Sequence, residues 1–360
     1  MRILVVNVGS TSIKLRIIGE HDRVEGSEDL APLATLGAGV LDRAIGRFGP
    51  IDAVGHRIVH GGTTFTAPVI VTDEVRADLR ALIDLAPLHQ PPALDALDAV
   101  SEVTAGIPAV ACFDTAFHAT LPDEASTYAI PAPWRALGAR RYGFHGLSHA
   151  WASRRALEVG DLPASARIVT CHLGGGASLA AVAGGRSVDT TMGLTPLDGL
   201  VMASRSGSVD PGLVLWLQQD RGLSADEVSD ALERRSGLIG LCGTGDMREV
   251  TARAEAGDAA ATLAFGVYLH RLRAGIAAMS AALGGVDALV FTGGVGEGSA
   301  AVRAGAAAGL AFLGVDIDEA ANTAGAPDRR LSPPGAAVST IVVEAREDLE
   351  IARGVRAALA

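Results

Sequence analysis

The sequence predicts an α/β protein built from two similar halves, and two β-hairpin patterns carry that prediction. In residues 2–20 an apolar run is followed by a small polar turn and then by a second apolar run. Residues 167–191 repeat this order, with a run of glycines at the turn. Alternating apolar and polar side chains are typical of strands, and glycine turns join antiparallel strands. Since helical stretches follow both hairpins, we expect a duplicated α/β fold with a ligand in the cleft between the halves.

Apolar side chains recur at helical spacing in five further segments. These segments are residues 74–86, 92–104, 224–236, 249–282 and 347–359. Pro87, Pro91 and Pro92 mark a loop at 88–90, and glycine and proline indicate another across 322–336. A third strand-loop unit follows, in which the strand 288–292 runs into the glycine loop 293–298 and then into a helix start at Ser299. A strand that leads through glycines to a helix N-terminus is a ready anion site.

Composition and charge exclude several classes of protein. The 360 residues suffice for two domains, and a hydrophobic fraction of 49% excludes global disorder. A net charge of −11 argues against binding to a nucleic-acid backbone, which requires basic faces. Three cysteines without metal-ligand spacing indicate reduced thiols in a cytosol. The N-terminal apolar run is too short for a signal peptide and no run could span a bilayer, so we expect a cytoplasmic protein without a membrane or nucleic-acid partner.

Lys14 is the only lysine of the chain, since the other 29 of its 30 basic residues are arginines. It ends the polar run that begins at Asn7, directly after the apolar segment 3–6. A lysine carries a compact charge on a flexible stem, which suits contact with a phosphate. A strand, a small polar loop and a lysine are a phosphate-binding arrangement, although a single lysine is ordinarily a solvated surface residue.

Four further segments place Arg, His or Asp between glycines and apolar residues: 55–62, 113–118, 141–149 and 204–211. Each has an ordinary explanation when it is taken alone. Three histidines fit a structural role as well as a catalytic one: His60, His118 and His149. Arg57 fits an ordinary ion pair, and the glycine segments 174–176 and 293–298 fit plain turns.

Together these segments resemble the successive motifs of the acetate kinase family, in that family's order and over nearly the whole chain. The residues that carry the resemblance are MRILVVNVGSTSIK, VGHRIVHGG, LAPLHQPPAL, FDTAFH, RRYGFHGLSH, HLGGGAS, DTTMGLTPLDGLVMASRSGSVDPG, SGLIGLCGTGDMR and FTGGVGEGSAAVR. The family belongs to the acetate and sugar kinase/Hsp70/actin superfamily. The resemblance therefore implies two duplicated actin-like, ribonuclease H-like domains with the active site in the cleft between them. It implies domains at 1–116 and 117–348, with the C-terminal helix, 349–360, packing back on the first.

The resemblance also implies a homodimer that catalyses Mg²⁺-dependent, reversible phosphoryl transfer from ATP to acetate, giving acetyl phosphate and ADP. A carboxylate is already ionised at pH 7, so this chemistry needs cations against anion repulsion rather than a general base. By resemblance, Arg57 binds the substrate carboxylate and Arg205 steadies the transferring phosphoryl group. His145 matches the family's transition-state histidine. Asp114 matches the active-site acid, and we interpret it as orienting an arginine or the metal shell.

Further positions match the family's ligand-binding residues. For Mg²⁺, with Mn²⁺ as a substitute, these are Asn7 and Glu347, whose oxygens suit a hard ion. The phosphate channel is matched by Ser10, Ser12 and Lys14. The nucleotide positions are His172, Leu173, Gly174, Gly175, Gly176, Asp246, Met247, Arg248, Gly294, Val295, Gly296, Glu297 and Gly298. The small apolar acid pocket is matched by Val59, Leu88, Phe144 and Pro196, which are otherwise explained as plain core.

Several features depart from the family pattern. Gly175 and Gly298 stand where the family usually has Asn, Gln90 replaces a third Asn, and the segment from Lys14 to Arg57 is shorter than usual. We therefore expect catalysis to be retained and contacts to the nucleotide to be fewer. Two alternatives remain. One is a propionate or butyrate kinase of the same family, and the other is a non-catalytic nucleotide-binding protein on an actin-like fold.

Overall fold

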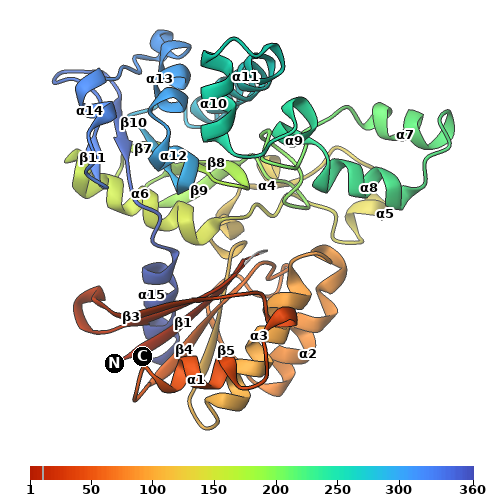
Figure 1. The fold of residues 1–360 in the computed structure, drawn as a ribbon, viewed down its shortest axis with the longest axis vertical. Helices are drawn as coiled ribbons and strands as arrows, with labels where there is room; N and C mark the ends of the chain where they lie inside the picture. Colours follow the sequence, from red (N-terminus) through yellow and green to blue (C-terminus); the bar gives the residue numbers. More distant parts are fainter. Residues whose placement is uncertain (10–11) are drawn as a thin grey trace. The chain divides into compact units, whose positions relative to one another are not determined.

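The computed structural model describes residues 1–9 and 12–360, which form two compact units (Figure 1). Unit 1 contains Met1–Ala119, Phe144–Trp151 and Arg346–Ala360, and unit 2 contains Thr120–Gly143 and Ala152–Ala345. Each unit holds one six-stranded sheet. The units are defined by packing alone, and the predicted domain boundaries, 1–116 and 117–348, stay a prediction.

Unit 1 has the strand order β3-β2-β1-β4-β6-β5. The strands are β1 (Ile3–Val8), β2 (Ile13–Ile18), β3 (Val24–Leu30), β4 (Ala53–Ile58), β5 (Val69–Ile70) and β6 (Ala109–Phe113). β1 and β2 form the predicted antiparallel hairpin, whereas β1, β4 and β6 run parallel to one another. The carboxyl ends of these three neighbouring strands therefore meet at one edge of the sheet.

Helices pack on both faces of this sheet. They are α1 (Val40–Gly46), α2 (Asp73–Ala81), α3 (Gln90–Val103), α15 (Glu347–Leu359) and the start of α6 (Gly146–Gly160). Because side chains alternate along β1, Ile3 joins a buried cluster with α15 and Leu4 joins one with α1 and α3. Gly55 of β4 allows α15 to come close, since a Cβ there would lie 2.6 Å from a methyl group of Ile351.

The sheet of unit 2 repeats this topology strand for strand, with the order β11-β12-β10-β7-β8-β9. The strands are β7 (Arg167–Leu173), β8 (Ala177–Ala183), β9 (Arg186–Thr190), β10 (Ala288–Thr292), β11 (Arg329–Arg330) and β12 (Ser339–Val342). β7 and β8 form the second predicted hairpin, and the parallel strands β7, β10 and β12 correspond to β1, β4 and β6. The predicted duplicated α/β fold is confirmed, while the ligand cleft stays a prediction.

The helices of unit 2 are α4 (Asp123–Ser126), α5 (Ala132–Arg135), the rest of α6, α7 (Pro211–Gln219), α8 (Ala225–Arg234), α9 (Gly237–Cys242), α10 (Met247–Glu255), α11 (Ala259–Ala282), α12 (Gly293–Gly298), α13 (Ala300–Ala308) and α14 (Glu319–Thr323).

These helices correct two predictions. The single helix predicted at 249–282 is wrong, because Asp258 caps a second helix by accepting the N–H groups of Ala260 and Ala261. The loop predicted at 293–298 is also wrong, because these residues form the helical turn α12.

Five short 3₁₀ turns complete the secondary structure of the described chain. They are Glu20–Asp22, Leu33–Thr35, Ile83–Leu85, Ala116–Thr120 and Ala311–Leu313. Strand β11 lies inside the segment predicted as a loop at 322–336. None of the helices in the described residues combines the length and the apolar character that a membrane span requires.

Candidate active site

The polar side chains of unit 1 gather at the carboxyl edge of its sheet. Asn7 is the second-last residue of β1, Arg57 is the second-last residue of β4, and Asp114 follows directly after β6. These three strands are parallel neighbours, so residues far apart in sequence are brought to one edge. Ligands of α/β sheets bind at such edges, which makes this group the candidate active site of unit 1.

Arg57 and Asp114 form a two-point ion pair. The Arg57 Nε donates to one Asp114 oxygen at 2.9 Å, and its Nη2 donates to the other at 2.6 Å. The Asp114 side chain is only 2% exposed and that of Arg57 16%. Burial raises the pKa of the Asp114 carboxyl and works to lower the pKa of Arg57, but the charges of Asp114 and Glu347 hold the pKa of Arg57 above its ordinary value. This geometry fixes the plane of the guanidinium.

Asn7 and Glu347 meet at the remaining nitrogen of the same guanidinium. The Arg57 Nη1 donates to Asn7 Oδ1 at 3.1 Å and to Glu347 Oε2 at 3.3 Å. The Asn7 amide in turn donates to Glu347 Oε2 at 2.8 Å. Glu347 reaches this position as the first residue of α15. The structure thus brings the two predicted metal-binding residues together, next to Arg57.

The donor set of Asn7 and Glu347 fits Mg²⁺ in its chemistry. Both offer oxygens, which a hard cation prefers, and Mg²⁺ commonly keeps most of its waters and binds through one or two carboxylates. No group of three or more His, Cys, Asp and Glu within residues 1–9 and 12–360 has the arrangement of a metal site.

Asp114 also holds the turn that carries His145. The Asp114 carboxylate accepts a hydrogen bond from the His145 backbone N–H, and the Asp114 carbonyl accepts the N–H of Gly146 at 2.8 Å. His145 has a φ of 56°, a left-handed conformation that few side chains adopt. Glycine is required next to it, because a Cβ at position 146 would lie 2.1 Å from the Asp114 carbonyl oxygen. Backbone strain of this kind is typical of functional sites.

Two buried histidines support the same region in their neutral form. His118 is hydrogen-bonded through Nε2 to the Phe144 carbonyl at 3.0 Å, so this nitrogen must carry a proton. The His60 Nδ1 accepts the Gly62 N–H at 2.8 Å and therefore carries none. Burial lowers the pKa of each histidine to about 4. The structural explanation thus fits His60 and His118 better than a catalytic one.

The predicted acid pocket is only partly seen within unit 1. Val59 and Phe144 are buried, and the Phe144 ring packs edge-on against His60. Leu88, in contrast, is 44% exposed. Gln90 proves to be a supporting residue, because its side-chain amide bonds both the N–H and the carbonyl of His60 at 3.1 Å. In the sequence Gln90 stands out only as a departure from a motif. Its two hydrogen bonds to the backbone of His60 join residues 30 positions apart, so no local sequence pattern predicts them.

In unit 2 the structure brings Arg205 and Pro196 together. The Arg205 Nη1 donates to the Pro196 carbonyl at 2.6 Å. Burial lowers the pKa of Arg205, and the charge of Glu233 opposes that effect. The Arg205 side chain is half-buried, with one donor directed at a backbone oxygen. Removing part of a cation from water costs free energy, and this cost favours the binding of an anionic ligand beside it.

The two glycine segments of unit 2 lie side by side. His172, at the end of β7, is paired in register with Thr292, at the end of β10, so the segments that follow these strands share one edge. A Cβ at Gly293 would lie 2.7 Å from the Leu173 carbonyl oxygen, which shows how closely the two segments approach. The predicted nucleotide residues 172–176 and 294–298 are therefore brought together.

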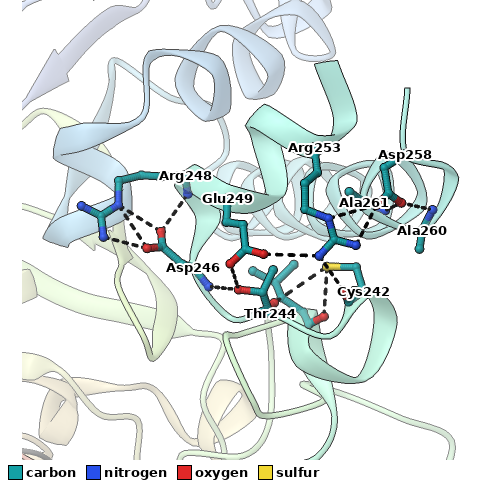
Figure 2. Close-up of polar contacts among 10 residues, drawn as sticks. Cys242, Thr244, Asp246, Arg248, Glu249, Arg253, Asp258, Ala260 and Ala261 are labelled. Carbon is teal, nitrogen blue, oxygen red and sulfur yellow. Dashed lines mark hydrogen bonds and ion pairs between the residues drawn. The ribbon is translucent and has the colours of Figure 1, made fainter. Parts of the chain in front are cut away.

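The predicted nucleotide residues 246–248 lie at the start of α10 (Figure 2). Asp246 caps this helix through the Arg248 N–H at 2.9 Å and pairs with the Arg248 side chain at 2.7 Å. The hydrogen bonds from Arg248 lower the pKa of Asp246 to about 2. The Arg248 side chain is 91% exposed, whereas Met247 is buried. This cluster leaves Arg248 open to a ligand from solution.

The first glycine turn is described in part. The Ser12 carbonyl accepts the Gly9 N–H at 2.9 Å, and Ser10 lies outside the described residues. Lys14 is exposed on β2, in register with Asn7 of β1 on one side and Asp29 of β3 on the other. Residues directly opposite in a sheet present their side chains to the same face, so Lys14 and Asn7 share a face.

Known proteins match this chain over most of its length. The model of the Acetokinase family matches residues 40–353. An acetate kinase from Clavibacter michiganensis subsp. michiganensis is 46% identical, with 99% of each chain covered. The crystal structure of Porphyromonas gingivalis acetate kinase is 36% identical, with a TM-score of 0.90 and 100% of each chain covered. A propionate kinase from Francisella tularensis subsp. tularensis SCHU S4 is 34% identical, with a TM-score of 0.90 and 98% of each chain covered. The predicted family resemblance is confirmed.

Proposed function

Because this chain belongs to the acetokinase family, we propose that it is a carboxylate kinase that transfers the γ-phosphoryl group of ATP to acetate. The products are acetyl phosphate and ADP, and the reaction runs in both directions. The observation that carries the proposal is the Arg57 guanidinium, held at two points by the buried Asp114 at the carboxyl edge of the unit 1 sheet. An arginine oriented in this way suits recognition of a small carboxylate.

In the proposed reaction, Arg57 binds the substrate carboxylate through Nη1, the nitrogen that Asp114 leaves available for exchange. A carboxylate oxygen attacks the γ-phosphorus, the bond between this phosphorus and the β,γ-bridging oxygen breaks, and ADP departs with the electron pair. No proton moves, because acetate is ionised near pH 7. Asp114 then acts by fixing Arg57 and the turn before α6 rather than as a base.

Arg205 and His145 are proposed to stabilise the charge of the transferring phosphoryl group. The main task in such a transfer is electrostatic, because charge spreads over the equatorial oxygens of a loose transition state. Arg205 is steadied by the Pro196 carbonyl, which supports this role. His145 is presented by a strained turn, which supports a fixed orientation of its backbone.

Asn7 and Glu347 are proposed to hold Mg²⁺. A bound magnesium ion would supply charge neutralisation between the anionic substrates. The two residues contribute adjacent oxygens, and both are hydrogen-bonded to Arg57. In this proposal the ion and the substrate carboxylate therefore bind to neighbouring members of one hydrogen-bonded group. Mn²⁺ is proposed as a substitute ion because it accepts the same oxygen ligands.

The nucleotide is proposed to contact the glycine segments 172–176 and 294–298 and the cluster 246–248. Glycine backbones there let N–H groups approach phosphates closely. The exposed Arg248 offers a cation for the nucleotide. Ser10, Ser12 and Lys14 are proposed to line the phosphate path, as the family resemblance implies.

Acetate is the preferred acid in this proposal, with propionate and butyrate as alternatives. Val59 and Phe144 support a small apolar pocket, to which we also assign Leu88 and Pro196. The propionate alternative is supported by the 34% identity of this chain to a propionate kinase. The alternative of a non-catalytic nucleotide-binding protein predicts ATP binding without acyl phosphate.

We further propose a cytoplasmic homodimer, as the family resemblance implies. The exposed side of α7 supports self-association, since Leu213, Leu215 and Trp216 are 39%, 52% and 42% exposed. Three buried free cysteines in the described chain support a reducing compartment.

A hydroxamate assay for acyl phosphate tests the proposed function. The purified protein should form acyl phosphate from ATP, Mg²⁺ and acetate, and more slowly from propionate and butyrate. ATP binding with no acyl phosphate from any short acid would establish the non-catalytic alternative. A faster reaction with butyrate than with acetate would support the proposed reaction class but show that acetate is not the preferred substrate.

A further inference from the structure

Arg303, in the first turn of α13, is the largest fully buried side chain in the described part of the chain, where it also has no carboxylate partner. Burial, together with the charge of Arg329, lowers the pKa of Arg303 to about 10. A buried guanidinium without a counter-charge is costly, so its place in the core calls for an explanation.

Within the described residues, the hydrogen bonds of Arg303 all go to oxygens of backbone and amide groups. Its Nη1 donates to the carbonyls of Gly296 and Glu297, at 2.8 and 2.6 Å. Its Nε donates to Asn322 Oδ1 at 2.7 Å, and its Nη2 donates to the Asn322 carbonyl at 2.6 Å. The guanidinium therefore ties the end of the glycine turn α12 to the end of α14.

Glu297 ties the opposite end of the same turn. Its carboxylate accepts the N–H of Gly293 at 2.8 Å and the N–H of Ala345 at 3.0 Å. The backbone of Glu297 is thus held by Arg303 while its side chain holds the first residue of α12. Together the two side chains clamp the turn at both ends.

The turn needs such clamps because it cannot hold its own shape. Four of the six residues of α12 are glycine, and each glycine disfavours a helix by about 1 kcal/mol relative to alanine. A single helical turn is also shorter than the length at which helices propagate. Contacts from outside the turn must therefore keep its backbone N–H groups in one orientation.

We propose that Arg303 is a positioning residue for nucleotide binding, which keeps the turn 293–298 in the conformation that receives the nucleotide. This inference rests on the proposed function, which assigns that turn to the nucleotide. The unpaired charge of Arg303 adds a positive potential near the turn, and this potential favours a polyphosphate ligand. Arg303 itself touches only protein groups, so its effect is exerted through the backbone of α12.

The test compares Arg303→Lys with a matched control, Arg329→Lys. Both arginines donate to the Asn322 carbonyl, but Arg329 bonds otherwise to Ala321 and Ala326 and not to the turn. A lysine at 303 keeps the charge but cannot bridge both carbonyls and Asn322 at once. We expect a roughly tenfold rise in the Kd of ATP by calorimetry without acetate, and the same rise in the KM of ATP. The KM of acetate and kcat should change less than about threefold, and Arg329→Lys should behave as the wild type.

A second variant covers the case in which Arg303→Lys does not fold. Asn322→Ser removes the Oδ1 acceptor that orients the Arg303 Nε while leaving both bonds to the turn, and it should raise the Kd of ATP by about threefold. Unchanged ATP binding in the folded variants, or equal rises in the KM values of ATP and acetate, would overturn the positioning role. Wild-type protein that binds no nucleotide would instead refute the proposed function, so the two failures are distinguishable.

Discussion

The carboxylate of Asp114 holds the guanidinium of Arg57 at two points and, through the same group, the backbone N–H of His145. One buried side chain therefore controls both the orientation of a cation and the shape of a strained turn. This double role supports the proposal that Asp114 orients other groups rather than acting as a base.

Asp114→Asn should lower kcat/KM for acetate by roughly 10²-fold, since a misplaced binding group has effects of that size. The amide can accept one bond from Arg57 but presents its NH₂ group to the other nitrogen. Steady-state kinetics and a thermal melt of the variant would check this. Asp230→Asn is the control, because Asp230 pairs with Arg234 and Arg235 on an exposed surface. Near-normal kcat/KM in Asp114→Asn would contradict the orienting role.

Val59→Ala should shift preference toward longer acids. Val59 is 9% exposed and follows directly after β4, close in sequence to Arg57. One methylene in an apolar pocket is worth about 1–3 kcal/mol of discrimination, so the ratio of propionate to acetate kcat/KM should rise about tenfold. Val24→Ala makes the same change at an exposed position and should leave the ratio alone. A fall in both activities with no change of ratio would place Val59 outside the pocket.

Mild acid should destabilise the protein through His60 and His118. Their pKa values are lowered by burial to about 4, from an ordinary value of 6.5. Between these values the unfolded chain binds more protons than the native one, so the free energy of unfolding falls as pH falls from 6.5 to 4. Each histidine contributes up to about 1.4 kcal/mol per pH unit in this window.

Urea unfolding at several pH values between 8 and 4.5 measures this slope. His118→Gln retains a donor for the Phe144 carbonyl and should make the slope shallower. His270→Gln changes an exposed histidine and should not. An identical slope in His118→Gln and the wild type would show that His118 is protonated in the native state over this range.

Gly175→Asn and Gly298→Asn should tighten ATP binding. A Cβ at either glycine has no described atom within 4 Å, and neither has a positive φ, so the backbone accepts the change. A neutral hydrogen bond contributes about 0.5–1.5 kcal/mol, which corresponds to a few-fold to tenfold lower nucleotide KM per site. Gly266→Asn offers similar space in the middle of α11 and serves as the control. No change or a higher KM in the double variant would mean that backbone groups or waters already make these contacts.

The sequence by itself was enough to predict both hairpins and the duplicated α/β fold. Alternation along β1–β2 and β7–β8 and the glycines between these strands are local features, set by neighbours within a few residues. The motifs likewise predicted roles for Arg57, Asp114 and Arg205, and these roles stay predictions. They did not predict that α10 and α11 are separate, nor that 293–298 is helical, because a cap and a clamped turn depend on individual hydrogen bonds.

Only the tertiary structure decided which of these residues work together. Arg57 meets Asp114 and Glu347 across 57 and 290 positions of sequence, because parallel strands and the returning helix α15 end at one edge of a sheet. The burial of Arg303 against the glycine turn is likewise invisible in a local pattern. The periodicity of apolar residues predicts the secondary structure of a segment. The partner of a buried charge, in contrast, depends on how elements distant in sequence pack together.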